Sequence, residues 1–160
     1  DEGPNRAVYL AGLECIDRSV GRLMQRLDEI GESNETLVLF LSDNGGVDER
    51  IDFRAAPRAD AADVRFSVEL REYDNAPLRS GKGSIYEGGV RVPMIARWPG
   101  HIAAGTVIAT PVHAVDILPT CFEVSKASVA TNHVLDGKSL VSLMINGQDA
   151  SLDQRAIYQY

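Results

Sequence analysis

The chain has 160 residues, of which 44% are hydrophobic and 24% charged, proportions that are ordinary for a globular domain. Its formal net charge of −7 argues against nucleic acid as the main partner, because nucleic-acid binders use clustered lysine and arginine on the phosphate backbone. No apolar stretch approaches the roughly 20 residues that a bilayer-spanning helix needs, so we expect no membrane span.

Residues 4–30 are predicted to form an amphipathic helix. Their apolar side chains recur at steps of three and four, the period of a helix with one apolar face. Gly31 follows the last of them, as glycine often does at a helix end. We expect the apolar face to pack on a sheet. It consists of Tyr9, Leu13, Ile16, Val20, Leu23, Leu27 and Ile30.

The next apolar run, residues 37–42, stops abruptly at Asp43 and Asn44, which two glycines follow. A short continuous run of this kind, bounded by turn residues, predicts a strand that is covered on both faces. In open α/β sheets, ligands gather beyond the carboxyl ends of such strands. We therefore expect Asp43 and Asn44 to lie at a ligand-binding edge.

The remainder of the chain is predicted to contain short elements separated by loops. Residues 47–75 show no clear period and are expected to form an irregular surface excursion. Pro93 favours the start or the edge of the strand in which it lies. Few strands are available to surround a fully buried one, so we expect an incomplete domain. The expected elements are strands at residues 92–98 and 107–112, helices at residues 116–123, capped by Asp116, and 139–145, and an extended segment at residues 155–160.

Asp43 and Asn44 offer a carboxylate and an amide oxygen. These hard donors suit Ca²⁺ or Mg²⁺ better than zinc. Two donors cannot fill a calcium shell, however, and the same residues with two glycines also suit a tight turn. Taken alone, the turn is the favoured interpretation.

Lys82 lies between two glycines, where the backbone can approach an anion closely and the ammonium can bind a phosphate or sulfate oxygen. The glycine spacing differs from that of a P-loop. Taken alone, an isolated Gly-Lys-Gly is more simply a solvated lysine in a loop.

The two clusters together, in this order, resemble the carboxyl-terminal half of the type I, formylglycine-dependent sulfatases, the arylsulfatase family. The resemblance rests first on Leu-Phe-Leu-Ser-Asp-Asn-Gly-Gly at residues 39–46. It rests equally on Leu-Arg-Ser-Gly-Lys-Gly-Ser-Ile-Tyr-Glu-Gly-Gly-Val-Arg-Val-Pro-Met-Ile at residues 78–95. It extends over nearly the whole chain. The further matching segments are residues 16–23, 98–100, 115–120, 135–140 and 155–158.

This resemblance implies a sulfuric ester hydrolase with an α/β fold, part of an alkaline-phosphatase-like mixed sheet flanked by helices. It implies that Asp43 and Asn44 are ligands of Ca²⁺, with Mg²⁺ as the other candidate. It implies that Lys82 is a catalytic and substrate-binding residue, contacting the sulfate and the leaving-group oxygen of a sulfate ester. An exported location, periplasmic or secreted, is the expectation from the same family, although the chain carries no visible signal; the oligomeric state is open.

The family's nucleophile motif, Cys/Ser-x-Pro-x-Arg, is absent from this sequence. Cys15 lies on the predicted helix, where a small buried thiol is expected, and Cys121 also lacks the motif. The two cysteines are too few and too far apart for a disulfide framework or a zinc site.

We therefore expect a carboxyl-terminal part of a sulfatase domain, residues 1–160, with an irregular insertion at about residues 47–76. The formylglycine is expected in an amino-terminal part, and this chain by itself should be inactive. Two alternatives stay open at this point: a phosphodiesterase or phosphonate monoester hydrolase of the same superfamily, and a non-catalytic anion- or metal-binding module.

Overall fold

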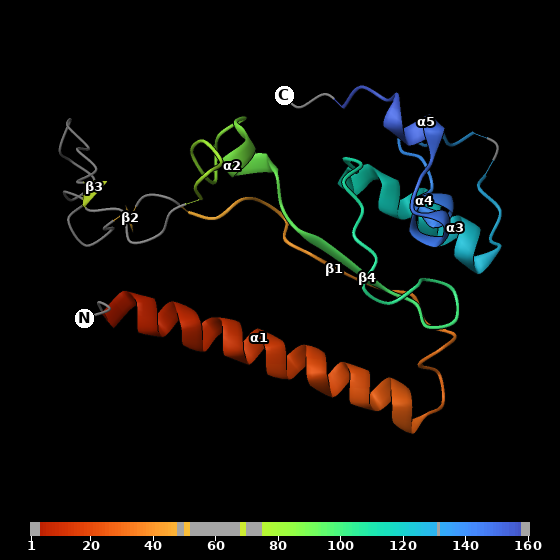
Figure 1. The fold of residues 1–160 in the computed structure, drawn as a ribbon, viewed down its shortest axis with the longest axis horizontal. Coiled ribbons are helices and arrows are strands. Elements are labelled where there is room, and N and C mark those ends of the chain that lie inside the picture. Colours follow the sequence, from red (N-terminus) through yellow and green to blue (C-terminus); the bar gives the residue numbers. More distant parts are fainter. Residues whose placement is uncertain (1–3, 48–49, 52–67, 70–74, 131, 158–160) are drawn as a thin grey trace. The chain divides into compact units, whose positions relative to one another are not determined.

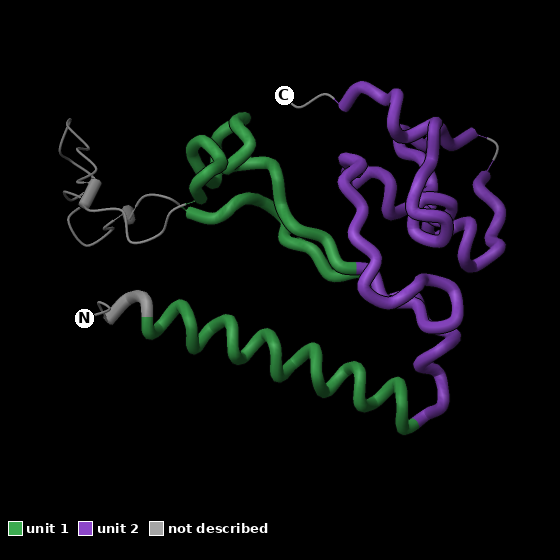
Figure 2. The backbone as a smooth tube through the Cα atoms, viewed as in Figure 1, with its two compact units in different colours: residues 1–29, 39–95 green, residues 30–38, 96–160 purple. Residues whose placement is uncertain are grey.

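The structure is a computed structural model and describes residues 4–47, 50–51, 68–69, 75–130 and 132–157. Its chain divides into two compact units (Figure 2). One unit comprises residues 1–29 and 39–95, and the other comprises residues 30–38 and 96–160. Figure 1 labels the elements of both units in chain order. Within the described residues, no helix combines the length and the apolar character that crossing a bilayer requires.

The first element is the long helix α1, Pro4–Glu29, which confirms the helix predicted from the apolar period. Gly31 ends it in the left-handed region, with φ of 74°. The apolar face was expected to pack on a sheet, and here the structure differs. Tyr9, Leu13, Ile16 and Leu23 are between 44% and 63% exposed. Periodicity fixes which side chains share a face, but the cover for that face must come from other segments.

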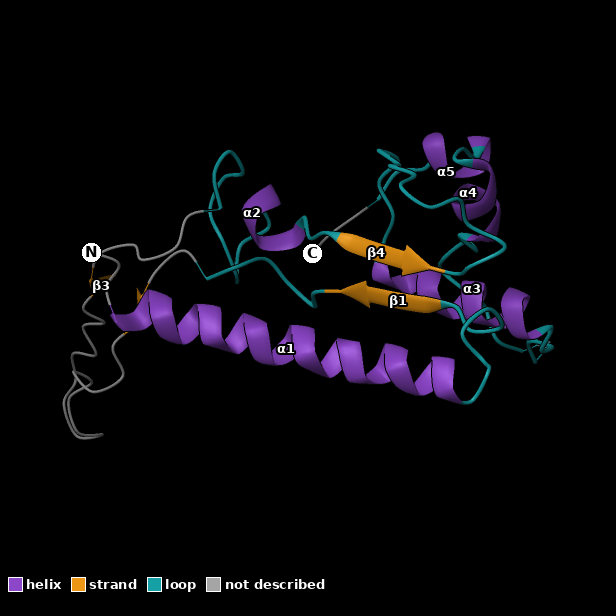
Figure 3. Ribbon diagram, turned by 60° about the horizontal axis from the view of Figure 1, so that its bottom comes forward, coloured by secondary structure: helices purple, strands orange, loops and turns teal. Residues whose placement is uncertain are grey.

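Strand β1, Val38–Leu41, lies within the first predicted strand, and β4, Met94–Arg97, lies within the second. The two strands pair in one sheet, and their arrows run in opposite directions (Figure 3). Pro93 directly precedes β4, as expected for a residue that cannot donate a ladder hydrogen bond. The expectation that β1 is buried on both faces is wrong for this structure, because Phe40 is 46% exposed. Within the described residues, β4 is the only strand that pairs with β1.

A second pair of short strands lies in the segment that was expected to be irregular. β2, Arg50–Ile51, and β3, Val68–Glu69, run antiparallel, with Arg50 opposite Glu69 and Ile51 opposite Val68. The rest of the predicted excursion, residues 48–49, 52–67 and 70–74, lies outside the described residues.

The second unit is built mainly from short helices: the 3₁₀ turn η2, Ala114–Asp116, then α3, Ile117–Ser125, α4, Val141–Asn146, and α5, Ala150–Asp153. α3 and α4 match the two predicted helices, whereas α5 was not predicted. Their core is apolar, and its buried side chains are Leu140, Leu143, Met144 and Leu152.

The strand predicted at residues 107–112 is absent, because these residues are irregular in the structure. Val107 is 92% exposed, and Pro111 lacks a backbone donor for a ladder. Residues 155–157 belong to no helix or strand, and residues 158–160, which complete the predicted extended segment, lie outside the described residues.

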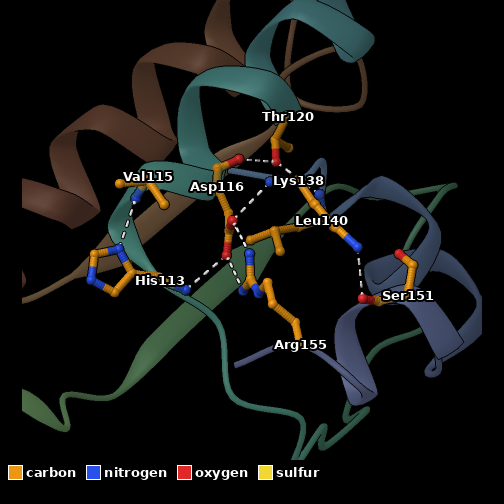
Figure 4. A network of polar contacts seen from close by, with 8 residues as sticks. All are labelled: His113, Val115, Asp116, Thr120, Lys138, Leu140, Ser151 and Arg155. Atoms are coloured by element: carbon orange, nitrogen blue, oxygen red, sulfur yellow. Dashed lines mark hydrogen bonds and ion pairs between the residues drawn. The ribbon is translucent and has the colours of Figure 1, made fainter. Parts of the chain in front are cut away.

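A buried carboxylate organises this unit (Figure 4). The side chain of Asp116 is fully buried and accepts hydrogen bonds from the backbone amides of His113, at 2.8 Å, and Lys138, at 2.9 Å. The guanidinium of Arg155 binds both carboxylate oxygens, at 2.5 and 2.7 Å. Burial by itself would raise the pKa of Asp116, but the hydrogen bonds from Arg155, Lys138 and His113 together hold that pKa below its ordinary value.

The prediction that Asp116 caps α3 is therefore correct in place but wrong in mechanism. α3 begins directly after Asp116, yet the Asp116 carboxylate makes no capping hydrogen bond to that helix. It closes instead a capping box over η2, in which the His113 side chain accepts a hydrogen bond from the Val115 amide. The hydroxyl of Thr120 extends the network by donating to the Asp116 carbonyl and accepting from the Leu140 amide.

Candidate functional site

Asp43 and Asn44 lie in the turn that directly follows β1, as the sequence predicted. Asp43 is exposed and Asn44 is half-buried. The hydroxyl of Ser42 donates to the Asn44 carbonyl at 2.8 Å, and Asn44 Nδ2 donates to Asp43 Oδ1 at 2.9 Å. That second bond uses the nitrogen end of the amide, so it leaves the amide oxygen to act as an acceptor or a metal ligand.

Lys82 lies in the loop between Arg79 and Glu87, with an exposed side chain. Its flanking residue Gly83 has a φ of 90°, a conformation that favours glycine. The Ser84 amide donates to the Gly81 carbonyl at 3.1 Å and closes a turn around the lysine. The Lys82 side chain therefore projects from a tight, glycine-flanked turn.

The structure brings these two predicted clusters together through their backbones. The Lys82 amide donates to the Gly46 carbonyl at 2.9 Å, and the Gly45 amide donates to the Gly89 carbonyl at 2.8 Å. The lysine loop thus lies against the turn that carries Asp43 and Asn44. An exposed carboxylate, an amide and an ammonium belong to two adjoining loops.

Glycine is required where the two segments meet. A Cβ at Gly45 would lie 1.8 Å from the Gly88 carbonyl oxygen, and a Cβ at Gly88 would lie 1.8 Å from the Ser80 carbonyl oxygen. Gly88 and Gly89 belong to the one-turn helix α2, Glu87–Val90, and both are buried.

Asn75 was missed as a site residue. It is half-buried, and its Nδ2 donates to the Gly46 carbonyl at 2.9 Å and to the Ser80 carbonyl at 3.2 Å. It therefore bridges the turn that carries Asp43 and Asn44 and the loop that carries Lys82. Sequence position alone offers no signal for this role, because Asn75 is 29 positions from Gly46 and closes a segment without periodicity.

A second contact braces the lysine loop from within. The Arg79 guanidinium carbon lies 3.7 Å from the centroid of the Tyr86 ring, a cation–π contact. The Arg79 carbonyl accepts from the Gly88 amide at 2.8 Å. Arg79 therefore ties the start of the loop to α2 through both its side chain and its backbone.

The donor set fits an alkaline-earth ion in kind but is short in number. Among the residues that the structure describes, no group of three or more His, Cys, Asp and Glu side chains could hold a metal. Asp43 and Asn44 supply two oxygen donors, whereas Ca²⁺ takes six to eight. A complete shell would need further donors.

The two cysteines and two of the histidines lie outside these two loops. Cys15 and Cys121 are free thiols, and both are exposed, so the expectation of a buried Cys15 is wrong. His101 stacks on Trp98 with ring centroids 3.9 Å apart, and His113 serves the capping box of η2.

Comparison with known proteins identifies clear relatives. The family described as Sulfatase matches residues 1–127. The chain is 37% identical over 136 residues to steryl-sulfatase from Mus musculus, an alignment that covers 85% of this chain and 20% of that protein.

Two solved structures are also similar to this chain. The crystal structure of Ps i-CgsB in complex with k-i-k-neocarrahexaose matches with a TM-score of 0.73 and 32% identity, covering 92% of this chain and 28% of that one. The structure of BT4656 in complex with its substrate D-glucosamine-2-N,6-O-disulfate matches with a TM-score of 0.58 and 26% identity, covering 86% and 22%. These matches confirm the predicted fold class, part of an alkaline-phosphatase-like sheet with flanking helices.

Proposed function

Since this chain belongs to the sulfatase family, we propose that it forms the carboxyl-terminal part of a sulfuric ester hydrolase. In this proposal Asp43 and Asn44 are two ligands of a Ca²⁺ ion, and Lys82 binds the sulfate group of the substrate. The observation that carries the proposal is the 2.9 Å hydrogen bond from the Lys82 amide to the Gly46 carbonyl. It fixes the lysine loop against the turn that carries both oxygen donors.

The share of each relative that is covered supports the fragment part of the proposal. The chain spans 20% of the length of steryl-sulfatase, 28% of the Ps i-CgsB chain and 22% of the BT4656 chain. A Cys/Ser-x-Pro-x-Arg motif is absent from the 160 residues. The formylglycine nucleophile would therefore come from an amino-terminal part, and the 160 residues alone would hydrolyse no sulfate ester.

Lys82 would stabilise the leaving group of the ester. As the S–O bond of the ester breaks, negative charge develops on the leaving-group oxygen, and a nearby ammonium stabilises that charge. The exposure of the Lys82 side chain leaves it free to reach a ligand. Removal of one such preorganised donor typically costs about 10²- to 10³-fold in rate.

Asp43 and Asn44 would hold the ion through one carboxylate oxygen and the amide oxygen. Ca²⁺ fits this pair because it prefers carboxylate and carbonyl oxygens, and Mg²⁺ is the second candidate. When bound, the ion supplies positive charge that polarises the sulfate oxygens.

The test uses the full-length protein that carries this sequence and an aryl sulfate as substrate. We expect Lys82→Ala to lower kcat by about 10²- to 10³-fold, and Asp43→Asn to raise the Ca²⁺ concentration needed for half-maximal activity. The matched controls are Lys126→Ala and Asp28→Asn, which alter an exposed cation and an exposed carboxylate outside the site. Full activity in both site variants would overturn the assignments.

The same protein is assayed on a matched phosphate ester. Faster hydrolysis of the phosphate ester than of the sulfate ester would favour the phosphodiesterase alternative. Binding of Ca²⁺ without hydrolysis of either ester would favour the non-catalytic module.

A further inference from the structure

The side chain of Asn75 joins the two halves of the candidate site. Its Nδ2 atom donates to the carbonyl oxygen of Gly46 at 2.9 Å and to that of Ser80 at 3.2 Å. Gly46 ends the turn that carries Asp43, and Ser80 lies two residues before Lys82. A side-chain amide has two N–H donors, so one nitrogen can bind both carbonyls at once.

The Gly46 carbonyl is the point at which these contacts converge. It accepts one hydrogen bond from Asn75 Nδ2 and another, also of 2.9 Å, from the Lys82 amide. A carbonyl oxygen has two lone pairs, so the two bonds do not compete. If the Asn75 bond is lost, the Lys82 amide is the remaining donor to the Gly46 carbonyl oxygen among the described residues.

The surroundings fix the Asn75 amide in place. A Cβ at Gly46 would lie 2.7 Å from Asn75 Oδ1, so the amide packs directly on the glycine. Ser80 has a φ of 62°, a left-handed conformation that is unfavourable for a non-glycine residue. The bond from Asn75 to the Ser80 carbonyl helps to hold that strained residue.

We propose that Asn75 is a positioning residue that sets the separation between the metal-ligand turn and the lysine loop. The proposal rests on the proposed function, because it assigns Lys82 and Asp43 to one sulfate ester. Asn75 acts through Lys82 and the turn rather than through contact with the substrate. A displacement of about 1 Å between groups that act on one substrate can cost about 10²-fold in rate.

The first test measures kcat and KM of variants of the full-length protein on an aryl sulfate. Asn75→Ala removes both bonds, and Asn75→Asp keeps the shape but places carboxylate oxygens against two carbonyl oxygens. We expect both variants to lower kcat by about 10- to 100-fold with little change in KM. The control is Asn34→Ala, an exposed asparagine that should leave both constants unchanged. Wild-type kcat in both Asn75 variants would overturn the proposal.

A double-mutant cycle separates positioning from a general loss of structure. If Asn75 acts through Lys82, Asn75→Ala combined with Lys82→Ala should be less than about 2-fold slower than Lys82→Ala alone. Fully additive losses would show that Asn75 acts by another route and would overturn the proposal. Circular dichroism confirms folding, and Asn75→Asp, of nearly equal volume, replaces the alanine variant in the cycle if that variant unfolds.

Amide hydrogen exchange decides the question without relying on activity. The Lys82 amide is bonded to Gly46, so we expect it to exchange at least about 10-fold faster in Asn75→Ala than in the wild type. Unchanged exchange at Lys82 would overturn the proposal even if the protein is an active sulfatase. Inactivity of the wild-type protein toward sulfate esters would instead refute the proposed function, and the exchange result would still decide whether Asn75 fastens the two loops.

Discussion

Replacement of Asp116 by alanine should destabilise the second unit more than any surface change. The carboxylate accepts hydrogen bonds from the backbone amides of His113 and Lys138 and from two nitrogens of Arg155. Without it, the guanidinium of Arg155, whose side chain is only 13% exposed, loses its counter-charge. Two backbone donors lose their acceptor as well.

The expected cost follows from these contacts. Removing one member of a buried ion pair costs about 3–5 kcal/mol, because the other charge stays buried without a partner. Each buried amide left without an acceptor adds about 1 kcal/mol or more, unless water enters the space. We therefore expect Asp116→Ala to lower the free energy of unfolding by at least about 3 kcal/mol, a large share of the 5–15 kcal/mol that is typical of whole domains.

The assay is urea-induced unfolding of the 160-residue chain, followed by the fluorescence of Trp98. This is the single tryptophan of the chain, and it lies in the same unit as Asp116. The control is Glu29→Ala, which removes an exposed ion pair with Arg26 and should cost about 0.5 kcal/mol or less. Equal effects of Glu29→Ala and Asp116→Ala, both below about 1 kcal/mol, would refute the reasoning.

Two further predictions concern acid and glycine. The folded-state pKa of Asp116 lies below its ordinary value of 3.8, so its stabilising effect is complete above that pH and is lost as the pH falls further. Urea titrations should therefore show the stability difference between the wild type and Asp116→Asn shrinking below pH 3.8, and a difference that stays constant down to pH about 2 would contradict this. Gly45→Ala should cost about 1–3 kcal/mol, because its Cβ would lie 1.8 Å from the Gly88 carbonyl oxygen. Gly12→Ala, with no atom within 4 Å of the new Cβ, should instead stabilise α1 by about 0.5–1 kcal/mol. Thermal unfolding followed by circular dichroism measures the stability of both glycine variants. Equal changes in stability for Gly45→Ala and Gly12→Ala would contradict a close approach of the Gly88 carbonyl to Gly45.

Features that depend on neighbouring residues were predictable from the sequence. The apolar period located α1, since side chains three and four positions apart share a helix face. Gly31 adopts the left-handed conformation that is typical of a glycine after a helix. The turn with Asp43 also follows its strand as predicted.

Features that depend on distant residues were not predictable in the same way. The partners of Asp116 lie as far as 39 positions away, so its carboxylate was interpreted as a local cap. Nothing in the residues next to Gly88 shows that the Ser80 carbonyl approaches it. The apolar run at β1 indicated burial, but burial requires a second segment to cover Phe40. Asn75 escaped notice for the same reason.

The bond between Asn75 and Gly46 also affects how the chain between them can vary. It joins two residues that are 29 positions apart and so ties together the ends of the intervening segment. The spacing of Asp43 from Lys82 in space therefore depends on this bond and not on the number of residues that separate them in the chain.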